Sequence, residues 1–213
     1  MRGFPKTWTQ AQEKRFDAYL PYLGTRRLIN AVPCLHVAGT NGKGSVCAML
    51  ESMLRCAGFK TGLFTSPHLY CQTERIKING KPIEENRMRQ GMARIKETLP
   101  HIGYFEQTFF CAMEAFEEQR CEIAVIETGI GGAMDVTNLV APLVTVLTNI
   151  GLDHTAVLGD TMEKIALQKA GIAKEKTPMV LYPGLPEEAQ KAIEQYCKHI
   201  GAPVYSAEEI GCK

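Results

Sequence analysis

The chain has 213 residues, 45% of them hydrophobic and 22% charged, which gives it the length and composition of a protein with a packed core. Its net charge of +1 argues against nucleic acid or an anionic membrane as a partner. No apolar stretch is long enough to span a bilayer, and the first residues lack the apolar core of a signal peptide. The eight cysteines contain no C-x-x-C pair, so we expect reduced thiols in a cytoplasmic protein. We expect a monomer, since no exposed apolar stripe stands out in the sequence.

Residues 9–30 carry apolar side chains at helical spacing and predict an N-terminal helix. The next apolar run, 35–38, has the length of a buried strand and ends at Gly39. A glycine-rich turn follows, after which apolar residues return at helical spacing from Val46. A strand, such a turn and a helix together form a phosphate cradle. Glycines let backbone amides face one anion, and the helix N-terminus adds partial positive charge.

The turn reads G-T-N-G-K-G-S and supplies groups that suit a nucleotide phosphate. Lys43 would reach the outer phosphates, and the Ser45 hydroxyl would face them or their metal. The match to G-x-x-x-x-G-K-[ST] is imperfect, because the loop is shorter and Gly44 stands where Ser or Thr is expected. A turn that merely joins strand to helix is the alternative. We predict that the nucleotide is bound by Gly39, Thr40, Asn41, Gly42, Lys43, Gly44 and Ser45.

Strands and helices alternate along the rest of the chain. The predicted strands are 61–66, 76–78 with a turn at Asn79-Gly80, 123–126, 143–147, 179–182 and a short one near 204. The predicted helices are 84–99, 109–119, 161–173 and 187–199. This alternation predicts an α/β fold with a doubly wound, mainly parallel sheet that contains the phosphate loop.

Polar side chains follow several predicted strands at the point where each strand ends. Ser66 follows the second strand, Glu127 ends the 123–126 strand, and His154 comes shortly after the 143–147 strand. Ligands of such sheets bind beyond the carboxyl ends of the strands, so these residues should surround one polyphosphate pocket with Lys43. Oxygen ligands with few carboxylates suit Mg²⁺, which keeps some waters and takes substrate phosphates as ligands.

Each of these residues also has a plainer structural explanation. Ser66 can cap a turn, His154 can be a satisfied loop histidine, and Asp135 is an ordinary turn-forming residue. Glu127 is harder to explain in this way, because a carboxylate at the end of a buried strand needs a partner or an ion. The prediction rests on the convergence of four strand ends rather than on any single residue.

These motifs resemble the folylpolyglutamate synthase/dihydrofolate synthase family of the Mur ligase superfamily. They run from about His36 to Pro183 in that family's order and spacing: G-T-N-G-K-G-S, T-S-P-H-L, E-R-I-x-I-N-G, E-x-G-x-G-G-x-x-D-x-T-N, L-D-H, L-G-D-T and K-A-G-I-x-K. The resemblance implies a domain of the Mur ligase central type. It also implies an ATP-dependent amide ligase that adds L-glutamate to a folate or to dihydropteroate through an acyl phosphate.

The resemblance also implies roles for the residues at the strand ends. Residues 41–45 hold the ATP phosphates, and Ser66, Glu127 and His154 bind a first Mg²⁺. The residues with catalytic roles are Lys43, His154 and Lys169. Helical periodicity alone would make Lys169 a solvated lysine. In the family, the lysine at this position is carbamylated and binds a second Mg²⁺. Carbamylation requires a neutral amine and hence a lowered lysine pKa.

The resemblance also extends to a substrate pocket. The residues that resemble the family's dihydropteroate pocket are Phe105, Gln107, Thr108, Asp135 and Val136. The chain departs from the family at Ala133-Met134 and at Gln72-Thr73. These departures leave the ATP chemistry intact and put the choice of substrate in doubt.

Family members continue past the equivalent of Lys213 into a smaller α/β domain that helps to hold glutamate. We therefore expect residues 1–213 to form an incomplete N-terminal ATP-binding domain that is inactive by itself as a ligase. Two alternatives from other classes are a P-loop ATPase or kinase and a non-catalytic nucleotide-binding module. A peptidoglycan-type ligase is the alternative within the superfamily.

Overall fold

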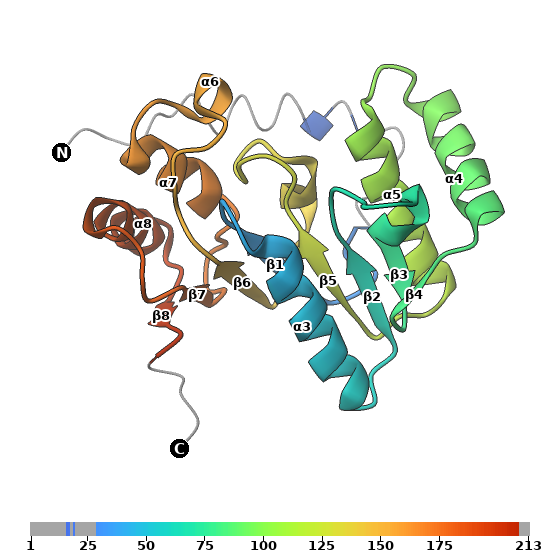
Figure 1. The fold of residues 1–213 in the computed structure, drawn as a ribbon, viewed down its shortest axis with the longest axis horizontal. Helices are drawn as coiled ribbons and strands as arrows, with labels where there is room; N and C mark the ends of the chain where they lie inside the picture. Colours follow the sequence, from blue (N-terminus) through green and yellow to red (C-terminus); the bar gives the residue numbers. More distant parts are fainter. Residues whose placement is uncertain (1–15, 18, 20–28, 209–213) are drawn as a thin grey trace.

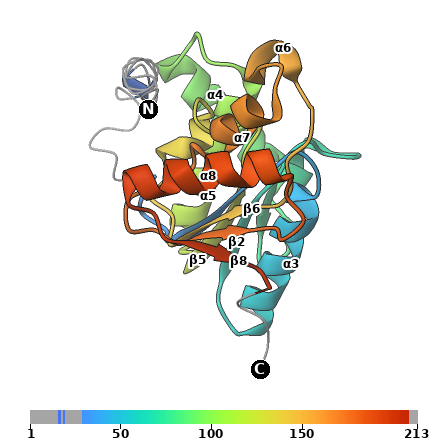
Figure 2. The same cartoon turned by 90° about the vertical axis from the view of Figure 1, so that its left-hand side faces the viewer.

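A computed structural model describes residues 16, 17, 19 and 29–208. Most of the helix predicted over 9–30 therefore lies outside the described residues. The described part has three layers, with a sheet between helix α3 on one side and helices α5, α7 and α8 on the other (Figures 1 and 2). Within it, no helix has both the length and the apolar character needed to cross a membrane.

Eight strands form one sheet in the order β4-β3-β2-β5-β1-β6-β7-β8. The six strands from β2 to β8 in this order pair in parallel, and only the β3–β4 hairpin is antiparallel to its neighbours. The predicted mainly parallel sheet is confirmed. The strand bounds are β1 Cys34–Ala38, β2 Thr61–Phe64, β3 Ile76–Ile78, β4 Lys81–Pro82, β5 Ile123–Glu127, β6 Val144–Leu147, β7 Met179–Leu181 and β8 Val204–Ser206.

The helices predicted between residues 46 and 199 are present, although several of their ends differ. The helix bounds are α3 Lys43–Cys56, α4 Glu85–Thr98, α5 Tyr104–Glu118, α6 Thr155–Leu158, α7 Met162–Ala170 and α8 Glu187–Ile200, with 3₁₀ helices η1 Gln72–Arg75 and η2 Val136–Leu139. Helix α5 begins five residues before the predicted Phe109, because Gly103 caps it ahead of the run of buried side chains. The single-turn elements η1, η2 and α6 were not predicted, since a periodic pattern needs more than one turn.

The central strands are buried on both faces, as their continuous apolar runs predict. On β1, Val37 packs toward α3, and its neighbour Ala38 packs into the core with α7 and α8. On β2, Leu63 and Phe64 likewise point to opposite faces, toward α3 and α5. Successive strand side chains alternate between the faces. This arrangement fixes the carboxyl ends of β1, β2, β5 and β6 at one edge of the sheet (Figure 1).

The β3–β4 hairpin closes one side of this edge. Asn79 and Gly80 have φ values of 47° and 74°, which fits the predicted two-residue turn. The Asn79 side chain accepts a hydrogen bond from the Thr61 amide at 2.8 Å, which ties the turn to β2. Pairing of Phe64 with Ile76 then brings the end of η1 beside the end of β2.

Gly62 in β2 provides a test of the packing between the sheet and α5. A Cβ added to Gly62 would lie 2.7 Å from the ring of the fully buried Phe116, so neither group can move aside easily. We expect Gly62→Ala to lower the free energy of unfolding in urea by about 1–3 kcal/mol. In the control Gly151→Ala, the added Cβ would lie 3.7 Å from Thr40, an ordinary contact, and the change should be much smaller. Equal losses would contradict this packing.

Candidate functional site

The loop between β1 and α3 lies directly against the end of β6. Gly39 has a φ of 151°, and a Cβ at this position would collide with the Thr148 hydroxyl. Gly42, with a φ of 79°, is the left-handed N-cap of α3. Both positions therefore favour glycine. Gly39 lies too close to Thr148 for a side chain, and Gly42 has a left-handed backbone conformation.

Side chains and carbonyls after β6 hold this loop in place. The amides of Thr40 and Asn41 donate to the backbone oxygen and side-chain oxygen of Asn149, at 2.9 and 2.7 Å. The Thr148 hydroxyl donates to the Asn41 carbonyl at 2.7 Å, and the Gly151 amide donates to the Thr40 hydroxyl at 3.0 Å. The amides of residues 40 and 41 are thus engaged within the protein, and an incoming anion would meet the amides that begin α3.

The N-terminus of α3 is suited to an anion. No side chain caps it, and its first turn contains no acidic residue. The first amides of a helix have no partner inside the helix, and the helix dipole adds positive character there. Lys43 opens the helix, and its Nζ donates to the Thr40 carbonyl at 3.3 Å. With Gly44 and Ser45 in the same turn, this end of α3 can surround a phosphate group.

Glu127 lies beside this helix end. Its side chain is buried, and its Oε2 accepts a hydrogen bond from the Ser66 amide at 2.9 Å. A Cβ added to Gly44 would lie 3.6 Å from the same oxygen. Burial raises the pKa of Glu127, and the Ser66 amide, Lys43 and Arg75 partly oppose this shift. A desolvated carboxylate with one amide donor and two cations nearby is a chemically suitable ligand for a hard divalent cation.

Lys169 comes to the same place from α7. It is only 2% exposed, and its Nζ donates to the Gly39 carbonyl at 2.9 Å. The solvated lysine that periodicity favoured is wrong, because the inner side of α7 lies under the phosphate loop. Burial lowers the pKa of Lys169 to about 8, with a further lowering by Lys43 and an opposing effect of Asp153.

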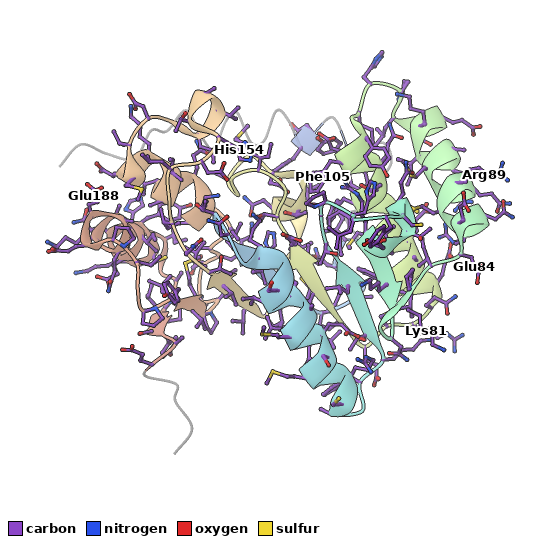
Figure 3. All side chains as sticks on the ribbon, viewed as in Figure 1. Lys81, Glu84, Arg89, Phe105, His154 and Glu188 are labelled. Atoms are coloured by element: carbon purple, nitrogen blue, oxygen red, sulfur yellow. The ribbon has the colours of Figure 1, made fainter. Side chains whose placement is uncertain are left out.

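Asp153 was not among the residues selected from the sequence, although it stands in the L-D-H motif beside His154. Its position after β6 could have identified it as a site residue, because ligands of such sheets bind beyond the carboxyl ends of the strands. The His154 Nε2 lies 3.6 Å from the Asp153 carboxylate, and the His154 side chain is 48% exposed. His154 has a left-handed backbone and caps α6. Figure 3 shows it at the same edge of the sheet as Phe105.

A hollow of about 640 Å³ lies at the carboxyl ends of the strands. It is lined by Thr40, Lys43, Ser66, Pro67, Arg75, Phe105, Glu106, Gly129, Ile130, Met134, Asp135, Asp153, His154, Val157, Leu158 and Gln168. The structure thus brings a loop lysine, the Ser66 segment and the Asp153-His154 pair to one cavity. In the described ranges, no three His, Cys, Asp or Glu side chains are grouped closely enough to hold a metal. The metal roles of Ser66, Glu127, His154 and Lys169 stay predictions.

Only some of the residues expected to bind the pterin reach this hollow. Phe105 and Asp135 line it. Thr108 is fully buried, and its hydroxyl donates to the Tyr104 and Phe105 carbonyls within α5. Val136 is also buried in the core, and the side-chain Nε2 of Gln107 donates to the Ile102 carbonyl at 3.0 Å. Their substrate roles stay predictions, and the packing gives each of these three a structural role as well.

Asp135 also shapes the loop between β5 and η2. Its two oxygens accept four hydrogen bonds of 2.6–3.2 Å, from the amides of Gly129, Ile130 and Thr137 and from the Thr137 hydroxyl. Burial raises the pKa of Asp135, and these hydrogen bonds oppose the shift. Asp135 therefore has the turn-forming role expected of it, and it also lines the hollow.

Most of the chain is similar in sequence to known proteins. The family model of the Mur ligase middle domain matches residues 37–201. The chain is 38% identical over 217 residues to the human protein "Folylpolyglutamate synthase, mitochondrial", which covers 96% of this chain and 36% of that protein. It is 40% identical over 190 residues to "Dihydrofolate synthase/folylpolyglutamate synthase" of Bacillus subtilis, covering 84% of this chain and 43% of that protein.

Solved structures of folylpolyglutamate synthases are also similar to this chain. The "FPGS-AMPPCP complex" matches with a TM-score of 0.84 and 32% identity over 92% of this chain and 50% of that one. The structure "E.coli FolC in complex with DHPP and ADP" matches with a TM-score of 0.82 and 33% identity, over 94% and 50%. The chain therefore spans about half the length of these solved relatives and less than half of the curated ones.

The buried Glu127 carboxylate predicts a particular pH dependence of stability. Because its pKa is raised in the folded protein, the folded state binds more protons than the unfolded state just above pH 4.5, and stability falls as the pH rises. Glu127→Gln removes this loss while keeping an acceptor for the Ser66 amide. We expect the ligand-free variant to exceed the unaltered protein in free energy of unfolding at pH 7 and to match it near pH 4.

The control for this measurement is Glu188→Gln, on the exposed surface of α8 (Figure 3). Urea unfolding of all three proteins at both pH values gives the comparison. A lower stability of Glu127→Gln at pH 7, or the same pH dependence in both variants, would show that Glu127 does not carry the expected desolvation cost.

Proposed function

Because the chain belongs to the folylpolyglutamate synthase/dihydrofolate synthase family of Mur ligases, we propose that it supplies the ATP- and metal-binding site of an ATP-dependent acid–amino-acid ligase. The acid is a folate or dihydropteroate, and the amino acid is L-glutamate. The observation that carries the proposal is the uncapped N-terminus of α3, with Lys43, Lys169 and the buried Glu127 around it. The solved relatives include complexes with AMPPCP and folate and with Mn, AMPPNP and L-glutamate.

In this proposal, ATP lies with its phosphates at the start of α3. The first amides of α3 and the Lys43 ammonium bind the phosphate oxygens and draw negative charge away from the γ-phosphorus. Phosphoryl transfer depends mainly on such positioning and charge stabilisation. A divalent cation, when bound, would neutralise further phosphate charge, and Glu127 with the neighbouring Ser66 and His154 would hold it.

The acyl substrate lies in the hollow, where Phe105 is part of the lining beside its aromatic ring. Its carboxylate oxygen forms a bond to the γ-phosphorus while the bond to the β–γ bridging oxygen breaks, which gives an acyl phosphate and ADP. The amino group of glutamate then attacks the acyl carbon. A carbon–nitrogen bond forms, phosphate leaves, and the amine loses a proton.

We include in the proposal a carbamate on Lys169. With a pKa of about 8, about one Lys169 side chain in ten is neutral at pH 7, far more than for an ordinary lysine. The neutral Nζ attacks the carbon of CO₂, a nitrogen–carbon bond forms, and one proton is released. The product is an anion, which replaces a positive charge that would repel a cation by an oxygen ligand that would bind it.

A thermal melt tests the nucleotide part of the proposal. Mg-AMPPNP at about a hundred times its dissociation constant should stabilise the protein by about 2.7 kcal/mol, a rise in Tm of about 5–10 °C. Lys43→Ala should lose most of this rise, because the phosphates lose their only cation from α3's first turn. Dihydropteroate should raise the Tm further in the unaltered protein.

Lys191→Ala is the matched control, because Lys191 is exposed on α8 and pairs with Glu187. It should keep the full nucleotide response. A response that Lys43→Ala retains would contradict the phosphate site at α3. A nucleotide response with none to dihydropteroate would favour a nucleotide-binding module or ATPase over a folate ligase.

The carbamate is tested by carbon-13 NMR with labelled bicarbonate in the presence of Mg²⁺. We expect one carbamate signal from the unaltered protein and its loss in Lys169→Arg, since a guanidinium cannot be carbamylated under these conditions. The signal should strengthen with Mg²⁺, because a cation stabilises the anionic product.

Lys174 offers the matched control. Burial lowers its pKa to about 8 as well, but its Nζ donates to the carbonyl and side-chain oxygen of Asn138 at 2.8 and 2.7 Å. Lys174→Arg should therefore keep the signal. A signal that survives in Lys169→Arg and disappears in Lys174→Arg would assign the carbamate to the wrong lysine for this proposal.

A further inference from the structure

The E-R-I-x-I-N-G segment contains a residue that the proposed function leaves without a role. Ile76 is fully buried in the core, and Asn79 and Gly80 form the turn of the β3–β4 hairpin. Ile78 packs against the same core, and Lys77 is the variable position of the motif. Glu74 and Arg75 remain. Of these, Arg75 lines the hollow together with Lys43 and Phe105.

The backbone of Arg75 is fixed beside the Ser66 segment. The pairing of Ile76 with Phe64 aligns β3 with β2, and the Thr65 amide donates to the Arg75 carbonyl at 3.0 Å. Arg75 therefore lies opposite Thr65, the residue that follows β2 and precedes Ser66. The sheet, rather than a mobile loop, sets the point from which its side chain starts.

Two contacts also hold the side chain. Its Nε donates to the Nδ1 of His68 at 2.9 Å, and its Cζ lies 5.3 Å from the centre of the Tyr104 ring. The contact with Tyr104 is a cation–π interaction. Within the part of the chain that the structure describes, no group accepts a hydrogen bond from the two terminal nitrogens of Arg75. The planar fork of the guanidinium is thus oriented and has donors left for a ligand.

The carboxylate nearest in sequence does not neutralise Arg75. The two oxygens of Glu74 accept hydrogen bonds from the amides of Leu69, Tyr70 and Cys71 at 2.8–3.0 Å, which fixes the preceding loop. No ion pair joins Arg75 to a carboxylate among the described residues. A half-buried cation that is held in one orientation and forms no direct ion pair with a described carboxylate is prepared to bind an anion from outside the chain.

The position of Arg75 indicates which anion this is. ATP phosphates would lie on the Lys43 side, at the start of α3. Arg75 lies on the side of α5, where its ring partner Tyr104 is adjacent to Phe105. Glu127 lies within the electrostatic reach of both Lys43 and Arg75. The carboxyl group that reacts with ATP has to lie between the phosphates and the aromatic part of its own substrate.

We propose that Arg75 binds the reacting carboxylate of the acyl substrate through its two terminal nitrogens and holds it, and then the acyl phosphate, beside the ATP phosphates. This inference rests on the proposed ligase function. It adds a substrate-binding residue that determines specificity for an acid over a neutral analogue. His68 and Tyr104 act through Arg75 as positioning residues.

Equilibrium binding of two probes tests this role. The first probe is pteroate, and the second is its neutral carboxamide, which has the same ring system and nearly the same shape. In the presence of Mg-AMPPNP, the unaltered protein should bind the acid about 10- to 100-fold more tightly than the amide. Arg75→Ala should bind both with equal affinity, and Arg75→Lys should retain part of the preference. The affinity for Mg-AMPPNP alone should stay unchanged in both variants.

The control is Arg89→Ala, on the exposed surface of α4, where Arg89 bonds to the Asn86 side chain (Figure 3). It should keep the full preference. Equal weakening of acid and amide in Arg75→Ala and Arg75→Lys would mean that Arg75 only supports the structure, and it would overturn this inference alone. Loss of Mg-AMPPNP binding in both variants would assign Arg75 to the nucleotide and overturn it too. If the unaltered protein binds Mg-AMPPNP but neither probe, the folate part of the proposed function fails with it.

Discussion

The close approach of Gly39 to the end of β6 is the constraint on which the rest of the site depends. No side chain fits between Gly39 and Thr148, so the backbone after β1 can lie directly against the loop after β6. That loop then engages the amides of residues 40 and 41, which leaves the start of α3 to an anion. The same carbonyl of Gly39 accepts the hydrogen bond from Lys169, so one glycine joins β1, β6 and α7 at one point.

The site contains buried ionisable side chains whose desolvation lowers the stability of the ligand-free protein. Burial shifts the pKa of Glu127 upward and that of Lys169 downward, which means that both side chains are pushed toward their neutral forms. Neither is relieved by a direct ion pair with the other in the described structure. An incoming polyphosphate with its cation supplies the missing charges, so groups that weaken the empty fold are the ones that can strengthen a complex.

A second set of polar groups keeps the parts of the site in register. The side-chain Nδ2 of Asn138 donates to the carbonyls of Ala133 and Gly171, which ties the loop after β5 to the end of α7. Lys174 in turn donates to both oxygens of Asn138. The loop that carries Asp135 is therefore connected to the helix that carries Lys169 by hydrogen bonds rather than by sequence proximity. Residues that look like turn-formers in the sequence set the geometry of the cavity.

Local sequence patterns were sufficient to predict the strands, the hairpin turn and the phosphate loop. Continuous apolar runs marked the buried strands, Asn79-Gly80 marked the hairpin, and the glycine-rich turn marked the phosphate loop. The tertiary structure decided the rest. Periodicity placed Lys169 in solvent because it describes one helix alone, whereas packing under Gly39 buries it. Thr108 and Val136 are buried between α5, η2 and the sheet, and Arg75 reaches the cavity because β3 pairs with β2. Burial and convergence arise between elements distant in sequence, so no local pattern could specify them.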